Sequence, residues 1–98
     1  MNFNPDPLEK DIEKKVCDFA KTRGILVYKF TSPARRSVPD RLFILPGGSV
    51  FWIEFKRKGK KPSPGQEAEI ERMRKQGARV HVSDNVEAGK RIIELESL

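Results

Sequence analysis

The chain has 98 residues, of which 37% are hydrophobic and 35% charged, and this balance excludes a disordered chain and fits one globular domain over residues 1–98. Its net charge of +6 favours an anionic partner such as nucleic acid, although solubility alone would also explain it. The single cysteine, Cys17, excludes an internal disulfide and suits a reducing compartment. No signal core or membrane-spanning apolar run is present, so we expect a cytoplasmic protein with no membrane partner.

The first predicted element is a helix that begins near residue 7. Asp6 is the expected N-cap, with Pro7 at the first helical position and Glu9 at the third position of a capping-box pattern. Gly24 is the expected C-terminal residue. Apolar residues at helical spacing predict one buried stripe: Leu8, Ile12, Val16 and Phe19.

Three strands are predicted next. The run ILVYKF at 25–30 is rich in β-formers, and residues 31–39 contain two prolines and form a loop with Arg35 and Arg36 at its tip. The stretch VPDRLFILPGGSVFWIEFKR at 38–57 is a β-hairpin with Pro46-Gly47-Gly48 as its turn.

The rest of the chain predicts helix, strand and helix. Ser63 caps a helix with Pro64 first and Gln66 third; Ile70 and Met73 face inward and Gly77 ends the helix. Residues 78–82 form a short strand, and Asp84 or Asn85 caps a last helix through residues 86–95. The expected fold class is therefore α/β, a mixed sheet flanked by helices in the order α-β-β-β-α-β-α.

The hairpin places charged residues among apolar ones. With a three-residue loop at 46–48, positions whose numbers sum to 94 face each other, so Asp40 lies opposite Glu54 with Cβ atoms roughly 4.5–5.5 Å apart. A two-residue loop would instead place Asp40 opposite Phe55. In either register the two acids lie close together, and Lys56 projects to the same face as Glu54.

Two neighbouring carboxylates in a partly buried sheet repel each other unless a cation compensates for them. Carboxylate oxygens are the ligands that Mg²⁺ and Mn²⁺ prefer, and Lys56 would then hold a phosphate or a water nucleophile. The alternative is that Lys56 simply neutralises the two acids in a surface cluster. Spacing alone leaves both readings open.

Pro39-Asp40 followed by Glu54-Phe55-Lys56 resembles the PD-(D/E)xK nuclease core. With Glu9 on the first helix, and KKPSPGQ (60–66) leading into a helix before the strand ARVHV, the succession is similar to the virus-type replication–repair nuclease (VRR-NUC) family. The resemblance implies a restriction-endonuclease-like fold and hydrolysis of phosphodiester bonds.

The resemblance also implies roles for individual residues. Asp40, Glu54 and the Phe55 carbonyl would bind the metal, and Lys56 would orient or help to deprotonate the attacking water. Glu9 would reach the site through a metal-bound water or a second ion. Gln66 would position Lys56 or the DNA backbone. Helix capping alone would also explain Glu9 and Gln66; we favour the functional reading for Glu9 and leave both readings of Gln66 open. Glu13, His81 and Trp52 are expected to be solvated, structural and core residues, respectively.

DNA affinity requires basic residues near the metal site, because phosphate contacts dominate it. The candidates flank the hairpin in sequence: Arg35, Arg36, Arg41, Arg57, Lys58, Lys60 and Lys61. A later set alternates with acids on one helix and is expected to be solvated: Arg72, Arg74 and Lys75 with Glu67, Glu69 and Glu71.

The predicted function is a Mg²⁺- or Mn²⁺-dependent endonuclease acting on branched or duplex DNA in a bacterial or phage-infected cell. The small size and the resemblance imply a Holliday-junction-resolvase-like homodimer, with the Phe3 region or the last helix as contact. Two alternatives are a flap, nick or restriction-like nuclease that works with a partner, and a non-catalytic nucleic-acid-binding module.

Overall fold

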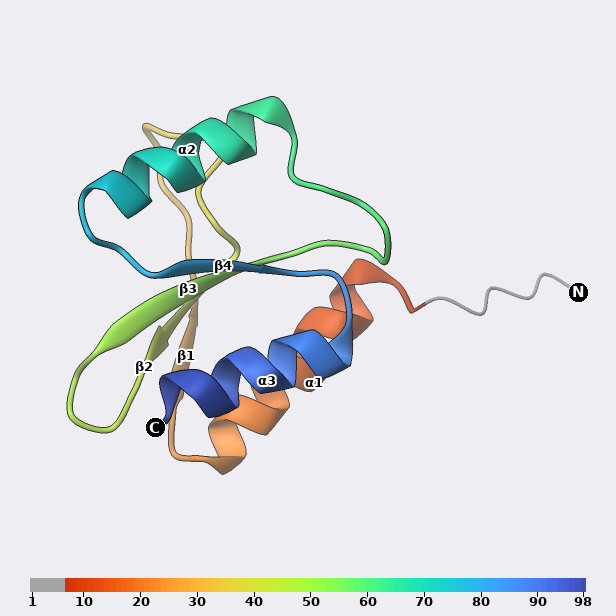
Figure 1. Ribbon diagram of the computed structural model, residues 1–98, viewed down its shortest axis with the longest axis vertical. Helices are drawn as coiled ribbons and strands as arrows, with labels where there is room; N and C mark the ends of the chain where they lie inside the picture. Colours follow the sequence, from red (N-terminus) through yellow and green to blue (C-terminus); the bar gives the residue numbers. More distant parts are fainter. Residues whose placement is uncertain (1–6) are drawn as a thin grey trace, which may run out of the picture.

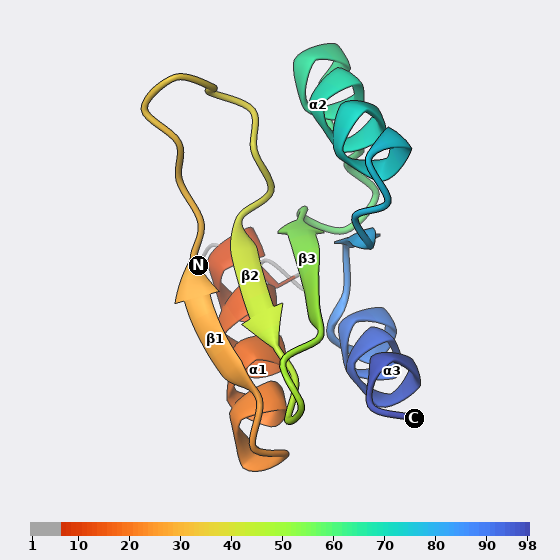
Figure 2. The same ribbon diagram turned by 90° about the vertical axis from the view of Figure 1, so that its left-hand side faces the viewer.

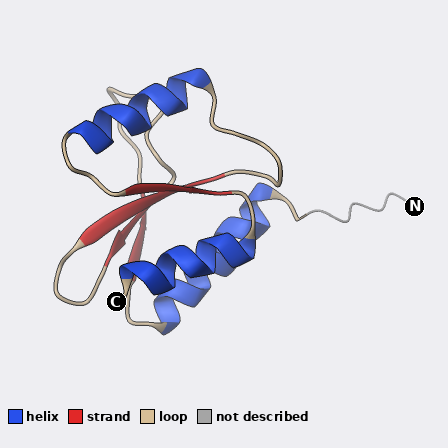
Figure 3. Ribbon diagram, in the orientation of Figure 1, coloured by secondary structure: helices blue, strands red, loops and turns tan. Residues whose placement is uncertain are grey.

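The computed structural model describes residues 7–98, in which seven elements follow one another as predicted (Figures 1 and 3). Three are helices: α1 (Glu9–Thr22), α2 (Pro64–Lys75) and α3 (Val86–Glu96). Four are strands: β1 (Leu26–Lys29), β2 (Arg41–Ile44), β3 (Val50–Phe55) and β4 (Val80–Ser83). The strands form one sheet in the order β1-β2-β3-β4, antiparallel except for the parallel pair β3–β4. The predicted α/β fold with a mixed sheet is confirmed.

Helices cover the sheet unevenly. Figure 1 shows α1 and α3 side by side on one side of the sheet and α2 on the other, against β4. In Figure 2, β1 and β2 lie in front of α1, and no helix lies in front of them. The side chains of Leu26 and Tyr28 on β1 are accordingly about half exposed.

The core lies between the sheet and the helix pair α1–α3. Phe43, Phe51, Ile53 and Phe55 are fully buried there, because alternate residues of a strand point to one face, and the rings of Phe43 and Phe51 stack at 4.8 Å. Cys17 is buried in the same cluster, and burial raises the pKa of its thiol to about 11. Cys17 therefore fills space in the core.

The hairpin has the three-residue loop. Leu42 faces Trp52 and Ile44 faces Val50, and Leu45 N–H donates to the Ser49 carbonyl at the loop's base. Gly47 and Gly48 both have positive φ, near 100°, which side chains disfavour. This loop sets the register that brings Asp40 opposite Glu54.

Three details differ from the predictions. Leu8, not Asp6, is the N-cap of α1; Asp6 lies outside the described residues. No side chain caps this helix start, so Glu9, as its first residue, forms no capping box. Leu8 is 41% exposed rather than buried, because it precedes the first turn and does not reach the core.

In residues 7–98, no helix is long and apolar enough to cross a membrane.

Candidate active site

Asp40 directly precedes the first residue of β2, Arg41, and still follows the pairing of β2 with its neighbouring strands. Its carbonyl accepts from Phe30 N–H at 2.9 Å, so its backbone is still tied to β1. Its carboxylate accepts from Phe55 N–H at 2.8 Å. The carboxylate thereby occupies the place of a strand carbonyl, which fixes it beside β3.

Pro39 explains why the ladder opens at this point. Continuing the register of β2 and β3 by two residues places Pro39 opposite Phe55 in a hydrogen-bonded pair position. A proline has no N–H to donate, so the Phe55 carbonyl receives no strand hydrogen bond from this residue. The Pro39-Asp40 dipeptide thus supplies a carboxylate and leaves a backbone carbonyl oxygen next to it.

Glu54 is buried without full compensation. Its side chain is 2% exposed, its Oε2 lies 3.3 Å from Lys56 Nζ, and its Oε1 has no hydrogen-bond partner within residues 7–98. The pKa of the Glu54 carboxyl is raised to about 7, first by burial and second by the Asp40 charge, while Lys56 opposes the shift. Burial also raises the pKa of Asp40, against the hydrogen bond from Phe55 N–H. The acids of the hairpin therefore form an electrostatically strained pair with one cation beside them.

Glu9 belongs to the same electrostatic cluster from the first turn of α1. The pKa of its carboxyl is raised by burial first and by the Asp40 charge second, while Lys56 lowers it. Across residues 7–98, however, no three His, Cys, Asp or Glu side chains are arranged to hold one metal ion together. The oxygens that could hold a cation are thus those of Asp40 and Glu54 together with the Phe55 carbonyl.

Gln66 performs the capping role at the start of α2. Its side-chain oxygen accepts from Ser63 N–H at 2.9 Å, and its own N–H donates to Ser63 Oγ at 3.2 Å. Both hydrogen bonds formed by Gln66 are internal to this capping box. The contacts of Gln66 therefore support its role as a helix-capping residue.

A basic cavity of about 370 Å³ opens beside Asp40, between the 31–39 loop and α1. Lys29, Arg35, Arg36 and Arg41 line it, with Glu13 as its second acid. Arg41 Nε donates to Glu13 Oε2 at 2.5 Å, which anchors that guanidinium to α1. Of the predicted DNA-binding residues, the structure thus places Arg35, Arg36 and Arg41 at the candidate site.

The remaining predicted DNA-binding residues lie on the turn after β3. Arg57, Lys58, Lys60 and Lys61 are half-buried to exposed, and Lys60 N–H donates to the Arg57 carbonyl to close the turn. Gly59 N–H donates to Asp84 Oδ2 at 3.0 Å, which ties the turn to the segment before α3. These residues are presented on a fixed turn rather than brought into the cavity beside Asp40.

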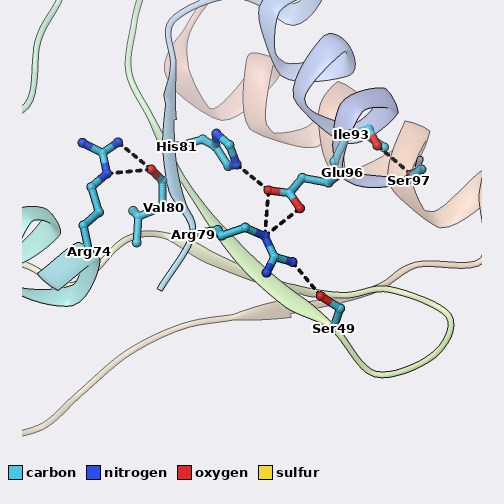
Figure 4. Close-up of polar contacts among 8 residues, drawn as sticks. All are labelled: Ser49, Arg74, Arg79, Val80, His81, Ile93, Glu96 and Ser97. Carbon is cyan, nitrogen blue, oxygen red and sulfur yellow. Dashed lines mark hydrogen bonds and ion pairs between the residues drawn. The ribbon is translucent and has the colours of Figure 1, made fainter. Parts of the chain in front are cut away.

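On α2 the prediction of solvation is wrong for Glu69, whereas Arg74 is exposed as predicted. Glu69 is only 8% exposed and accepts from Arg35 Nε at 2.8 Å. Arg74 donates through Nε and Nη2 to the Val80 carbonyl on the free edge of β4 (Figure 4). The helical spacing of Gln66, Glu69, Ile70 and Met73 is the signal that marks Glu69 as inward-facing.

His81 has the structural role expected of it. Figure 4 shows its Nε2 beside the Glu96 carboxylate on α3, at 2.7 Å, with Arg79 Nε donating to the same carboxylate at 2.9 Å. Arg79 also donates to Ser49 Oγ at 2.6 Å. Glu96 thus joins α3, the start of β4 and the hairpin loop. Trp52 is half-buried and lies outside the core cluster between the sheet and α1–α3, and its ring packs edge-on against Phe30 at 5.9 Å.

Replacing Glu96 by alanine is expected to destabilise the fold by about 1–2 kcal/mol, because a nearly buried acceptor of two hydrogen bonds is lost. Chemical denaturation measures this. Glu94→Ala is the matched control: Glu94 is exposed and lies 3.7 Å from Arg23, so its loss should cost less than about 0.5 kcal/mol. Equal effects of the two substitutions would contradict the anchoring role of Glu96.

Comparison with known proteins decides the family. No family model matches the chain. A curated protein, "Putative nuclease p44" from Acyrthosiphon pisum secondary endosymbiont phage 1, is 43% identical over 77 residues, which are 79% of this chain and 83% of that protein. A solved structure described as "VRR_NUC domain" superposes with a TM-score of 0.82 and 36% identity, covering 88% of this chain and 94% of the other. The chain belongs to the VRR-NUC family. The resemblance carried by Asp40, Glu54 and Lys56 is thereby confirmed at the level of family and fold.

Proposed function

We propose that this VRR-NUC domain is a metal-dependent, structure-selective DNA endonuclease that hydrolyses phosphodiester bonds. One observation carries the proposal: Glu54 Oε1 is buried, has no hydrogen-bond partner in the part of the chain that the structure describes, and belongs to a carboxylate next to Asp40. A buried acceptor oxygen without a partner is costly. A divalent cation between the two carboxylates would remove that cost.

The chain's own oxygens fit such a cation. Glu54, Asp40 and the Phe55 carbonyl would hold it, and hard oxygen donors of this kind suit Mg²⁺ or Mn²⁺ with water completing the coordination. When bound, the ion supplies Lewis-acid stabilisation of the charge that develops on the phosphate.

Lys56 would orient the attacking water. Its Nζ is held 3.3 Å from Glu54 Oε2 and its side chain is 16% exposed, so it has one fixed partner and an edge open to substrate. Glu9 contributes negative charge to the same site from α1 and would receive a proton or a water-mediated contact there. Gln66 would act through its helix start, by keeping α2 in place.

The DNA backbone would lie along the basic cavity beside Asp40. Lys29 and the arginines that line that cavity would contact phosphates on one side of the scissile bond, and the 57–61 turn would add four more basic side chains. Contacts of this kind bind phosphates without reading bases. Selectivity would then come from the shape of the DNA, which is the basis for proposing branched substrates.

A Holliday-junction-resolvase-like homodimer is part of the proposal, because symmetric cutting of a four-way junction needs two sites related by a two-fold axis. Of the two predicted contact regions, Phe3 lies outside the described residues. The last helix, α3, packs against α1 and leaves Leu95 exposed. Sedimentation equilibrium across a concentration series would measure the association.

The test is cleavage of a labelled four-way junction against a linear duplex of matched sequence with Mg²⁺ or Mn²⁺. We expect paired cuts in opposing strands of the junction and no cleavage in EDTA, with activity restored when metal is added back. Equal cleavage of both substrates would favour a flap, nick or restriction-like nuclease working with a partner. Binding without cleavage in every metal would favour a non-catalytic binding module and overturn the endonuclease.

A further inference from the structure

A second cavity, of about 350 Å³, lies between the tip of the 31–39 loop and the first turns of α2. It shares Arg35 and Arg36 with the cavity beside Asp40, so the two cavities adjoin along this pair of arginines. Arg72 of α2 lines it from the other side. None of the proposed catalytic residues lines this cavity.

The charges around the second cavity are unbalanced. Three guanidinium groups face one carboxylate, that of Glu69. Glu69 Oε1 accepts from Arg35 Nε at 2.8 Å and lies 4.0 Å from Arg72 Nε, so a single oxygen serves both arginines. Arg36 has no ion pair or hydrogen bond from its side chain within residues 7–98. A net positive cavity with an unsatisfied guanidinium attracts an anion.

Backbone and hydroxyl donors complete the lining. At the start of α2, Pro64 has no N–H, and the N–H groups of Gln66 and Glu67 are taken by Ser63. Gly65 N–H has no acceptor in the described part of the chain and lies at the positive end of the helix. A Cβ on Gly65 would lie 3.3 Å from Ser37 Oγ, which is tighter than most such contacts, so the helix start and the loop approach closely here.

We propose that this second cavity binds a backbone phosphate of the DNA substrate away from the scissile bond, through Arg36, Arg72, Ser37 Oγ and Gly65 N–H. Arg35 is a positioning residue in this arrangement, because its pair with the nearly buried Glu69 fixes the loop tip against α2. The phosphate would lie on the far side of Arg36 from Asp40, so the strand would be held at two separated points. This inference rests on the proposed nuclease function and adds a subsite to it.

Arg72→Gln is the variant that tests the subsite. Arg72 is 64% exposed and its pair with Glu69 is long, so its loss should leave the fold intact. Junction binding is measured by fluorescence anisotropy in EDTA, which prevents cleavage, over a salt series. We expect affinity to fall about tenfold and the slope of log K against log[salt] to decrease in magnitude by about 1. Arg91→Gln, an exposed arginine of α3 on the opposite side of the sheet, is the matched control and should match the wild type.

A scan of single methylphosphonate linkages locates the phosphate. One neutral linkage away from the cut should weaken binding by the wild type clearly more than binding by Arg72→Gln, which has already lost one of the contacts to that phosphate. Strands with a 5′-phosphate and a 5′-hydroxyl separate a backbone diester from a terminal phosphate, and dependence on the terminal group would overturn the backbone assignment. Wild-type cleavage combined with identical behaviour of the Arg72 and Arg91 variants would overturn the subsite alone. Absence of DNA binding by the wild type would overturn the proposed nuclease as well.

Discussion

Replacing Lys56 by alanine is expected to lower kcat/KM for DNA cleavage about 10³-fold, the size of effect typical for a positioned acid–base or water-orienting group. The loss should appear mainly in kcat. Lys56 is the one cation within 4 Å of Glu54 in the described residues, and its removal leaves the Glu54 and Asp40 carboxylates facing each other without it. Single-turnover cleavage with saturating enzyme separates this effect from weaker binding.

Lys15→Ala is the control for that experiment. Lys15 carries the same charge on the exposed face of α1 and should leave cleavage within about twofold of the wild type, as expected for a surface substitution. Binding of uncleaved junction in EDTA by Lys56→Ala should remain within an order of magnitude of the wild type. If Lys56→Ala instead cleaves at a rate within tenfold of the wild type, Lys56 only neutralises the two acids, and the catalytic assignment fails.

Replacing Glu54 by glutamine is expected to stabilise the metal-free protein at pH 8 by about 3 kcal/mol. The folded-state pKa of Glu54 is raised from 4.5 to about 7, so the folded protein holds this proton more tightly than the unfolded chain. The contribution of the Glu54 carboxyl to the free energy of unfolding of the wild type is therefore fully present below pH 4.5 and is lost as the pH rises through 7. Moving one carboxyl pKa from 4.5 to about 7 corresponds to about 3 kcal/mol, and a neutral amide removes that cost.

Urea denaturation in EDTA from pH 5 to 8 measures the difference between the two proteins. The gain in Glu54→Gln should be small at pH 5 and should grow with pH, whereas Glu67→Gln, on the exposed face of α2, should show no such trend. Adding Mg²⁺ or Mn²⁺ at pH 8 should stabilise the wild type and leave Glu54→Gln nearly unchanged. A Glu54→Gln variant that is less stable than the wild type at pH 8 without metal would show that the carboxylate is well compensated in the free protein.

Local rules account for much of what the sequence predicts correctly. The capping box of α2 needs only Ser63 and Gln66 at the right spacing, and both hydrogen bonds form. Each of Gly24 and Gly77 has positive φ directly after a helix, as a helix-ending glycine should. The one failure of this kind, the start of α1, involves residues next to the undescribed segment 1–6, where Leu8 replaces Asp6 as the cap.

Side-chain partners distant in sequence were not predictable in the same way. Glu69 and Glu13 were expected to be solvated, yet they hold Arg35 and Arg41 from 34 and 28 residues away. An alternating pattern of acids and bases on a helix looks the same whether the helix is exposed or packed against a loop. Only the position of α2 against the 31–39 loop determines that the Glu69 carboxylate is desolvated and forms an ion pair with Arg35.

The sequence by itself determined the family resemblance, the order of the elements and the closeness of Asp40 to Glu54 on neighbouring strands, because the position of a turn and strand alternation are local properties of the chain. The tertiary structure decided which of the two possible registers the hairpin adopts and how costly the placement of the two acids is. Burial of Glu54 under neighbouring elements leaves Oε1 without a hydrogen-bond partner among the described residues and raises the pKa of its carboxyl. It also decided which arginines are anchored and which are available to substrate, since desolvation and long-range ion pairs depend on packing that no local pattern encodes.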